Sequence, residues 1–527
     1  MFCYQCEQTT RGVGCVKVGA CGKTPETSDL QDVLVHAAKR LATKVAETPV
    51  AARPERLAVL IERSIFATLT NVNFDSEAVV RLIRDVVTAI GPEAGIAATA
   101  NREALVAWAA GSGIEARTAK IGADATGLQE LVLYGLKGIA AYSHHARQMN
   151  RRDETVDAFV VEALAKLDAG EANASALLAL ALATGKASVD VLALLDDAHV
   201  STFGKPVPTP VRIGHVPGKA ILVSGHDLVD LKALLEQTAG KGINVYTHGE
   251  MLPAHGYPEL KKYPHLVGHF GGAWMRQQKE FPGFPGPILM TTNCLQDPAS
   301  SYAGRLFTRD VVGWPGITHI DGRDFSAVVA AALAAPGFTD EETQSTHLVG
   351  FGHDTVLGVA DKVIDGVKSG AIKHFALIGG CDGSEGERSY YTDVAQAMPA
   401  DWMILTLGCG KFRLLGHDYG TVAGLPRLLD MGQCNDSYSA VKVALALADA
   451  FGCTVNDLPL SLVLSWFEQK AVCVLLALLH LGVKNIRIGP KLPAFVTPSV
   501  LKILVDAYAL KPIGEVEADI AAMAAAA

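Results

Sequence analysis

The sequence predicts a multidomain α and α/β protein, with an N-terminal helical bundle domain followed by two doubly wound parallel-sheet domains. Two patterns support this class. From Thr27 to about Val200, apolar residues recur at helical spacing. After the proline-rich stretch 204–210, which indicates a linker, short apolar runs alternate with helical segments, as in parallel α/β sheets. A chain of 527 residues should hold about three domains, and we expect them at 1–217, 218–356 and 357–527.

Composition and charge narrow the functional classes. The net charge is −9, so we expect no nucleic-acid partner. No uncharged apolar run reaches the eighteen or so residues of a membrane span, and the longest candidate is 471–479. The first residues lack a basic segment followed by an apolar core, so we expect a cytoplasmic protein without an export signal. In that compartment the ten cysteines indicate metal ligands or buried side chains rather than disulfides.

Four cysteines, Cys3, Cys6, Cys15 and Cys21, share a short glycine-containing segment with the spacing C-x2-C-x8-C-x5-C. Four thiolates on such a loop can wrap one tetrahedral metal or a cubane iron–sulfur cluster, because glycine allows tight turns. Structural zinc is the alternative. Zinc sites usually contain two C-x2-C pairs, and only one is present here, which favours iron–sulfur.

The helical region contains several amphipathic stripes. Ser28 and Gln31 match a capping box ahead of a stripe that runs to Leu41. Further stripes cover 57–71, 79–90, 128–149, 156–167 and 176–195, which indicates antiparallel helical bundles. His144 and His145 lie near the end of one helix. Adjacent helical residues face different ways, so a charge partner or a core histidine is favoured over a two-histidine metal site.

In the α/β region, residues of metal-binding types stand just after the predicted strands or on glycine-bearing turns. The strands are expected at 220–223, 243–246, 287–290, 347–350, 375–378, 403–407, 460–464 and 486–488. The candidate ligands are His226, Glu250, Cys294, Cys381, Cys409, Cys434 and Glu468. Because ligands bind at the carboxyl ends of strands in open α/β sheets, we expect these residues to converge between the two sheet domains. Thiolates mixed with carboxylates and imidazole indicate a cluster with both sulfur-bound and oxygen-bridged iron.

Other candidates are weaker. Cys453 and Cys473 lie in apolar helical runs and are expected to be buried side chains. His248 and His255 could ligate metal or relay protons, although a hydrogen-bonded loop histidine is favoured for both. The string Gly408-Cys-Gly-Lys411 lacks the full phosphate-loop pattern, and Gly350-Phe-Gly352 lacks the third dinucleotide glycine, so neither supports nucleotide binding.

Seven motifs together carry a family resemblance that covers essentially the whole chain. They are Met1-Phe-Cys-Tyr-Gln-Cys-Glu-Gln-Thr9, Ser224-Gly-His-Asp-Leu228, Tyr246-Thr-His-Gly-Glu-Met-Leu-Pro-Ala-His-Gly-Tyr257, Thr292-Asn-Cys294, Gly379-Gly-Cys-Asp-Gly383, Gly408-Cys-Gly410 and Trp466-Phe-Glu-Gln-Lys470. With these motifs the chain resembles a hybrid-cluster protein, of the family named hydroxylamine reductase. The resemblance implies a helical domain followed by two Rossmann-like sheet domains.

The resemblance also implies the cofactors. Cys3, Cys6, Cys15 and Cys21 would hold a [4Fe-4S] cubane, since family members with wider cysteine spacing carry [2Fe-2S] and the tight spacing is similar to the cubane group. The seven strand-end residues, His226, Glu250, Cys294, Cys381, Cys409, Cys434 and Glu468, would hold a hybrid [4Fe-2O-2S] cluster. The cysteine that matches Cys381 is a persulfide in the family.

The implied activity is the reduction of hydroxylamine to ammonia and water by two electrons and two protons. A redox partner protein would deliver electrons at the N-terminal cluster. The candidate catalytic residues are Glu250, His248 and Lys470, the latter two as proton donors or channel residues, with a surface lysine as the alternative for Lys470. Nitric oxide reduction, a nitrosative-stress regulator that modifies partner thiols, and a nickel enzyme similar to carbon monoxide dehydrogenase stay open as alternatives. The carboxylate ligands count against nickel.

Overall fold

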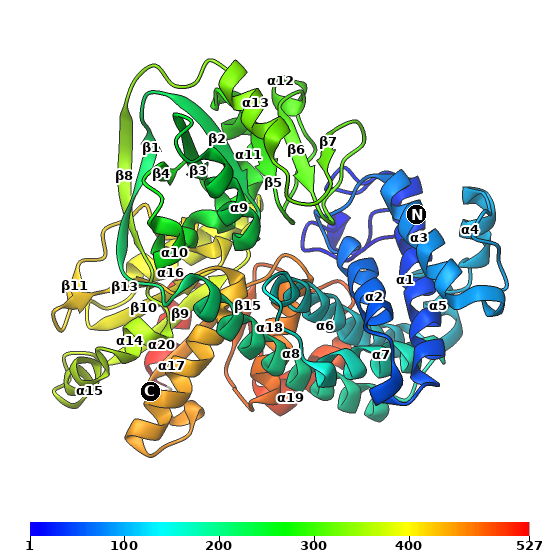
Figure 1. Ribbon diagram of the computed structural model, residues 1–527. Helices are drawn as coiled ribbons and strands as arrows, with labels where there is room; N and C mark the ends of the chain where they lie inside the picture. Colours follow the sequence, from blue (N-terminus) through cyan, green and yellow to red (C-terminus); the bar gives the residue numbers. More distant parts are fainter. Residues whose placement is uncertain (526–527) are drawn as a thin grey trace.

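Helices form the first part of the chain. In the computed structural model, which describes residues 1–525, eight α-helices precede the first strand (Figure 1). They are α1 (Pro25–Ala46), α2 (Glu55–Ala67), α3 (Ser76–Ile90), α4 (Arg102–Trp108), α5 (Ile114–Ile121), α6 (Ala123–Gln148), α7 (Glu154–Asp168) and α8 (Ala174–Phe203). The apolar stripes predict α1 to α3 and α6 to α8. The short helices α4 and α5 were not predicted.

The predicted capping box at Ser28 is wrong. Helix α1 begins at Pro25, and its N-cap is Thr24, whose hydroxyl accepts a hydrogen bond from the backbone N–H of Thr27 at 3.1 Å. Proline fits the first helical position because it has no N–H to satisfy there, so the helix starts one turn earlier. Gln31 is buried in the helix and donates to the carbonyl of Asn73 at 2.7 Å.

The first sheet has eight strands in the order β7-β6-β5-β2-β3-β4-β1-β8. Its strands are β1 (Thr209–His215), β2 (Lys219–Ser224), β3 (Ile243–Thr247), β4 (Leu266–His269), β5 (Ile288–Met290), β6 (Leu306–Arg309), β7 (Thr318–Ile320) and β8 (Glu342–Val349). Neighbouring strands are parallel except β8, which runs antiparallel to β1 at the edge. The predicted strand at 347–350 is therefore the end of an antiparallel edge strand, and the proline-rich stretch leads into a strand, β1, that was not predicted.

The second sheet has six strands in the order β13-β10-β9-β14-β15-β16, and all its pairings are parallel. Its strands are β9 (His374–Gly380), β10 (Trp402–Leu407), β13 (Leu428–Asp430), β14 (Leu460–Ser465), β15 (Arg487–Gly489) and β16 (Lys511–Pro512). A two-stranded hairpin, β11 (Thr421–Val422) and β12 (Leu425–Pro426), lies outside it. The buried strands predicted at 375–378, 403–407, 460–464 and 486–488 all belong to this sheet.

Helices accompany both sheets. In the first sheet region they are α9 (Leu228–Thr238), α10 (Pro258–Lys261), α11 (Gln277–Glu280), α12 (Ser300–Ala303) and α13 (Ser326–Ala334). In the second they are α14 (His353–Leu357), α15 (Ala360–Lys368), α16 (Ser389–Ala397), α17 (Ser437–Phe451), α18 (Gln469–His480), α19 (Pro498–Tyr508) and α20 (Val516–Ala524). This order of elements confirms the predicted fold class, whereas the domain boundaries at residues 217 and 356 stay a prediction.

The helical region and the second sheet share one core. Helix α18 packs against both α6 and α8, near the centre of Figure 1. Two glycines of α6 and α8 make this close packing possible: a Cβ on Gly138 would lie 2.4 Å from the Cβ of Cys473, and one on Gly185 would lie 2.2 Å from the carbonyl oxygen of Leu476. Among the described residues α8 is the one helix long and apolar enough to cross a membrane, with half of its most apolar window buried inside the protein.

Candidate metal centre

The register of the strands brings the predicted ligands to one edge of each sheet. In the first sheet Ser224 pairs with Met290 and Val223 pairs with Thr247, so β2, β3 and β5 end at the same level. In the second, Gly380 pairs with Ser465 and Gly379 pairs with Leu407, so β9, β10 and β14 do the same. His226, Glu250, Cys294, Cys381, Cys409 and Glu468 follow these ends within four residues. Cys434 follows β13.

Glycine is required where the strand ends of the second sheet approach one another. Gly380 has a φ of +111°, and a Cβ there would lie 2.1 Å from the carbonyl oxygen of Ser465. Gly408 has a φ of +72°, and its Cβ would lie 2.4 Å from the carbonyl oxygen of Gly380. Any other residue would be strained and would clash with backbone. The glycines before Cys381 and Cys409 therefore let these two cysteines come together.

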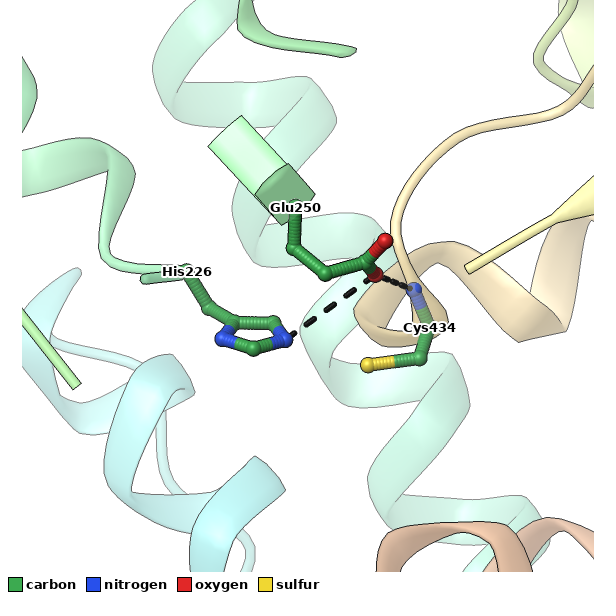
Figure 2. Close-up of side chains that lie close together, drawn as sticks. All are labelled: His226, Glu250 and Cys434. Atoms are coloured by element: carbon green, nitrogen blue, oxygen red, sulfur yellow. Dashed lines mark hydrogen bonds and ion pairs between the residues drawn. The ribbon is translucent and has the colours of Figure 1, made fainter. Parts of the chain in front are cut away.

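His226, Glu250 and Cys434 meet at the contact of the two sheets (Figure 2). One ligand atom from each lies within 4.8 Å of the others. The backbone N–H of Cys434 donates to Oε2 of Glu250 at 2.8 Å, and Nε2 of His226 lies 3.9 Å from the same oxygen. Oε1 of Glu250 is buried without a hydrogen-bond partner. A buried carboxylate oxygen that accepts no hydrogen bond is costly. This group of three ligand atoms therefore fits a bound metal.

Lys470 completes this group and is not a surface residue, since only 1% of it is exposed. Its ammonium nitrogen lies 3.1 Å from Nε2 of His226 and 3.3 Å from Sγ of Cys434. Its backbone N–H donates to Oε2 of Glu468 at 3.0 Å, so Glu468 caps α18. Burial alone would lower the pKa of Lys470, but the neighbouring Cys434 and Glu468 raise it above its usual value.

The four cysteines of this region are free and share one environment. Cys294, Cys381 and Cys409 pack against Trp274 and Phe467. Burial raises the pKa of the Cys294, Cys409 and Cys434 thiols well above its usual value and that of Cys381 to about 12. Without a cation these thiols would stay protonated, and a soft metal would hold them as thiolates. Four cysteines with two carboxylates and an imidazole therefore fit an iron–sulfur centre that also has oxygen ligands.

The N-terminal cysteines form a second group. Cys3 and Cys15 face each other through two backbone hydrogen bonds of 3.1 and 2.8 Å, and the Cys15 sulfur lies 3.2 Å from the hydroxyl of Thr10. Burial raises the pKa of Cys6, and the nearby Cys21 and Cys3 raise it further. All four cysteines of the loop are free. Four free cysteines, two of them buried and two partly buried, on one hydrogen-bonded loop fit a single metal cluster.

This loop docks onto the end of the second sheet. The backbone N–H of Glu7 donates to the carbonyl of Phe467 at 3.0 Å. The buried carboxylate of Glu7 accepts from Arg388 at 3.1 Å, and Arg388 also donates to Ser465 and to the carbonyl of Trp466, at 2.6 and 2.9 Å. Cys6 therefore lies one residue from a contact with Phe467, and Phe467 precedes the predicted ligand Glu468.

Two buried residues that the sequence analysis did not select hold these groups in place. The side-chain amide of Gln433 donates to the carbonyl of Glu250 at 2.7 Å, which links the two sheets. Arg388 is fully buried and joins the N-terminal loop to β14. Gln433 directly precedes Cys434, so the sequence could have indicated a role for it beside this ligand candidate. No local pattern predicts the role of Arg388, because its partner Glu7 is 381 positions away in the chain.

The other candidate residues have structural partners. His248 is buried between Ser224, at 3.0 Å, and Glu280, at 3.2 Å, and its described hydrogen bonds include none of the seven ligand candidates. His255 bonds to Thr247 at 3.0 Å. Lys411 is buried and paired with Asp430 at 2.6 Å, which agrees with the absence of a phosphate loop. Cys473 is fully buried, as predicted, and Cys453 is partly buried.

An apolar cavity of about 90 Å³ reaches the group of cysteines. Its inner end is formed by Cys381, Cys434, Glu468 and Lys470, and Leu445, which is 43% exposed, stands at its outer part. Most of its other lining residues are leucines, valines, alanines and other apolar residues, nearly all from the second sheet region. The cavity holds more than one water-sized molecule, and its walls offer no charge away from the metal-binding group.

The fold and the two cysteine groups together define a multidomain metalloprotein with sulfur-rich centres. The model of the Prismane/CO dehydrogenase family matches residues 1–521, and the chain belongs to this family, a class of iron–sulfur metalloenzymes. The chain is 57% identical to a hydroxylamine reductase from Zymomonas mobilis, covering 98% of this chain and 97% of the relative. It is 56% identical to a hydroxylamine reductase from Rhodospirillum rubrum, with both chains covered completely.

A solved structure shows the same fold. The carbon monoxide dehydrogenase IV of Carboxydothermus hydrogenoformans superimposes with a TM-score of 0.60 at 17% identity, covering 99% of this chain and 92% of that one. At that identity the likeness concerns the fold alone. Family membership implies that this protein carries iron–sulfur clusters.

Proposed function

We propose that this protein is a hydroxylamine reductase, which converts hydroxylamine to ammonia and water with two electrons and two protons. The observation that carries the proposal is the buried contact of Lys470 with His226 and Cys434, at 3.1 and 3.3 Å. A proton-bearing ammonium group stands there beside metal-ligating side chains. Relatives of that name, 56% and 57% identical over nearly the whole chain, support the same activity.

We assign the cofactors as follows. Cys3, Cys6, Cys15 and Cys21 would hold a [4Fe-4S] cubane. His226, Glu250, Cys294, Cys381, Cys409, Cys434 and Glu468 would hold a hybrid [4Fe-2O-2S] cluster. When bound, the iron supplies a Lewis acid and electrons for cleavage of the N–O bond. The buried Oε1 of Glu250 accepts no hydrogen bond, so it needs such a partner.

The protein's own residues supply the protons and the orientation. Lys470 holds a proton on Nζ at the inner end of the cavity, where it can donate to the nitrogen or oxygen of hydroxylamine. Glu468 fixes Lys470 by accepting its backbone N–H. Gln433 fixes Glu250 and His226 through their carbonyls, at 2.7 and 3.4 Å. His248 is the weaker candidate proton donor, because its two ring nitrogens already form hydrogen bonds with Ser224 and Glu280.

The N-terminal loop is the proposed entry point for electrons from a redox partner protein. Glu7 of this loop contacts Phe467, the residue that directly precedes the ligand candidate Glu468. Gln469, the next residue, donates to the carbonyl of Gln5 at 2.5 Å and to Thr70 at 3.2 Å. A short bonded path therefore joins the two proposed centres.

Nitric oxide reduction is the second candidate, and the lining of the cavity is compatible with it. The cavity that reaches Cys381 and Cys434 is lined almost entirely by apolar side chains, which suits a small uncharged molecule. Neutral hydroxylamine and nitric oxide both meet this condition. The same residues would serve either substrate.

Anaerobic turnover with reduced methyl viologen distinguishes the two candidates. We expect one ammonia for every two electrons with hydroxylamine, and a higher kcat/KM for hydroxylamine than for nitric oxide. Glu259→Gln, a surface change, should behave as wild type, whereas Glu250→Ala should abolish turnover. A higher kcat/KM for nitric oxide would make that molecule the substrate, and wild-type turnover of Glu250→Ala would refute the assignment of this site.

A further inference from the structure

The N-terminal cysteine loop carries an unusual surface. The three most exposed large apolar side chains among the described residues are Val13, Val16 and Val18, at 68%, 60% and 56%. They lie within six positions of one another, and we call them the valine patch. Single exposed apolar residues are common on protein surfaces, but adjacent ones indicate a binding surface.

The loop is held rigidly, so the exposure of these valines follows from its fold. The backbone N–H of Val13 donates to Thr10 at 3.1 Å, and that of Gly19 donates to Lys23 at 2.8 Å. Cys3 and Cys15 fasten the middle of the loop through their two backbone hydrogen bonds. The sequence could have placed polar residues at all three positions without losing a contact that holds the loop.

The valine patch adjoins the proposed N-terminal centre. Val16 directly follows Cys15, Val13 lies two residues before it, and Val18 lies three residues before Cys21. Cys3 and Cys21 are themselves partly exposed. A protein that covers the patch would therefore bring its own redox group close to these sulfurs, and electron transfer needs such proximity.

The exposed charged side chains of this loop are positive. Arg11 and Lys17 are exposed on the same loop, and no aspartate or glutamate occurs between residues 8 and 25. The whole chain carries a net charge of −9, so the positive charge of this loop is opposite in sign to that of the chain. Complementary charge steers association and selects partners. The charge complement of this surface is an acidic protein.

A second copy of the chain is a poorer occupant. In a two-fold dimer the same patch would face itself, which would bring Arg11 and Lys17 toward their own copies. Like charges placed opposite each other oppose such pairing. Small contacts with few apolar residues and a charged rim are typical of transient electron-transfer complexes rather than of stable dimers.

We propose that the valine patch, with Arg11 and Lys17, is the docking surface for a small acidic one-electron carrier protein. This proposal rests on the proposed role of the N-terminal loop as the entry point for electrons. One electron leaves the reduced carrier and enters the N-terminal centre, with no bond made or broken and no proton moved. Two such encounters supply the two electrons of one turnover.

The test uses the anaerobic holoprotein and an acidic [2Fe-2S] ferredoxin. Val13→Ser/Val16→Ser/Val18→Ser and the charge reversal Arg11→Glu/Lys17→Glu are compared with wild type. In each variant we expect the Kd for ferredoxin to rise roughly tenfold. The second-order rate of reduction of the N-terminal centre should fall by about the same factor. The wild-type rate should fall with rising salt, and the rate of the charge reversal should not. Leu182→Ser/Leu333→Ser/Val505→Ser, which alters exposed apolar residues elsewhere, should equal wild type.

Reduced methyl viologen separates this proposal from the proposed function. It needs no docking surface, so it should drive hydroxylamine turnover equally in all these variants. If the wild-type protein shows no such turnover, the reductase assignment is refuted. The Kd for ferredoxin would still test the docking surface in that case. Unchanged ferredoxin binding and reduction in both patch variants would overturn the proposal. A wild-type dimer that the serine variant converts to a monomer would instead assign the patch to a second copy.

Discussion

The ammonium nitrogen of Lys470 lies 3.3 Å from the sulfur of Cys434, at the place where the strand ends of both sheets meet. Lys470 is buried and Cys434 is partly buried. A full positive charge is costly in such a place unless negatively charged groups surround it. In the proposed centre, Glu468 and Glu250 would supply that negative charge together with Cys434 and Cys294, once a metal holds these cysteines as thiolates. Such a contact fits the proposed metal-binding site better than an ordinary core.

Replacing this lysine should damage catalysis without damaging the clusters. We expect Lys470→Met to lower kcat for hydroxylamine by about 10²- to 10⁴-fold, the usual contribution of a general acid, with unchanged iron content. Lys502→Met, at a side chain that is 74% exposed, is the matched control. Near-normal kcat for Lys470→Met would remove it from the mechanism.

Glu250 should be needed for the hybrid centre but not for the N-terminal one. Its Oε1 has no protein donor, so Glu250→Gln keeps the size of the side chain while removing the charge that a metal needs. We expect iron to be lost from the hybrid site, while the paramagnetic resonance signal of the N-terminal centre stays. Loss of both signals would mean that the substitution unfolds the protein rather than a single site.

Lys137 should set the reduction potential of the N-terminal centre. It is buried, donates to Gln5 at 3.1 Å and Thr68 at 3.4 Å, and has no carboxylate within 4.0 Å among residues 1–525. Burial lowers the pKa of Lys137 to about 8, against the effect of Glu130, Asp32 and Cys3, which raise it. Since a positive charge favours the reduced, more negative cluster, Lys137→Met should lower the potential by ~60 mV, a tenfold change in a one-electron equilibrium.

A redox titration followed by paramagnetic resonance measures this shift. Lys502→Met serves again as the control, because it removes the same charge from an exposed position. An unchanged or higher potential in Lys137→Met would show that the lysine does not act on the cluster.

His144 should make stability depend on pH. Burial alone would lower its pKa, but Asp310 and Glu62 raise it to about 10. A histidine with a raised pKa stabilises fully below its unfolded value of about 6.5, and this stabilisation is lost as the pH rises toward 10. The Tm of His144→Gln should therefore fall furthest below wild type near pH 6, by the equivalent of ~3 kcal/mol for a broken buried pair. The gap should narrow by pH 9 to 10.

Thermal scans at a fixed rate between pH 6 and pH 10 test this dependence. His417→Gln, at an exposed histidine that contacts Gln396, is the control and should show no such trend. A gap that widens with rising pH would contradict the charged state of His144.

Much of the fold and of the candidate site could be predicted from the sequence, because both follow local rules. A buried strand that stops at glycine predicts where Cys381 and Cys409 stand, and parallel strands bring such ends together. The predicted start of α1 was wrong because Thr24 caps the helix and Pro25 begins it, one turn before the capping pattern at Ser28. Strand β1 was missed because Pro210 resembles a linker. Pro210 lies near the start of the strand, where β1 pairs with β8 but not yet with β4, and proline is tolerated at such a position.

The long-range contacts could not be predicted. The burial of Lys470 depends on the docking of α18 against α6 and α8, and no local pattern distinguishes it from a surface lysine at a helix start. The pairing of Arg388 with Glu7 joins two residues that are 381 positions apart in the chain. Such partners are fixed by the packing of whole elements, so only the three-dimensional structure reveals them.

The central claim is that two different iron–sulfur centres occupy the two cysteine groups. Anaerobically purified protein, analysed for iron, zinc and sulfide together with paramagnetic resonance, tests it most directly. The assignment predicts about eight iron atoms per chain, no stoichiometric zinc, and two distinct paramagnetic species. About four iron atoms with one zinc, or a single species, would contradict it.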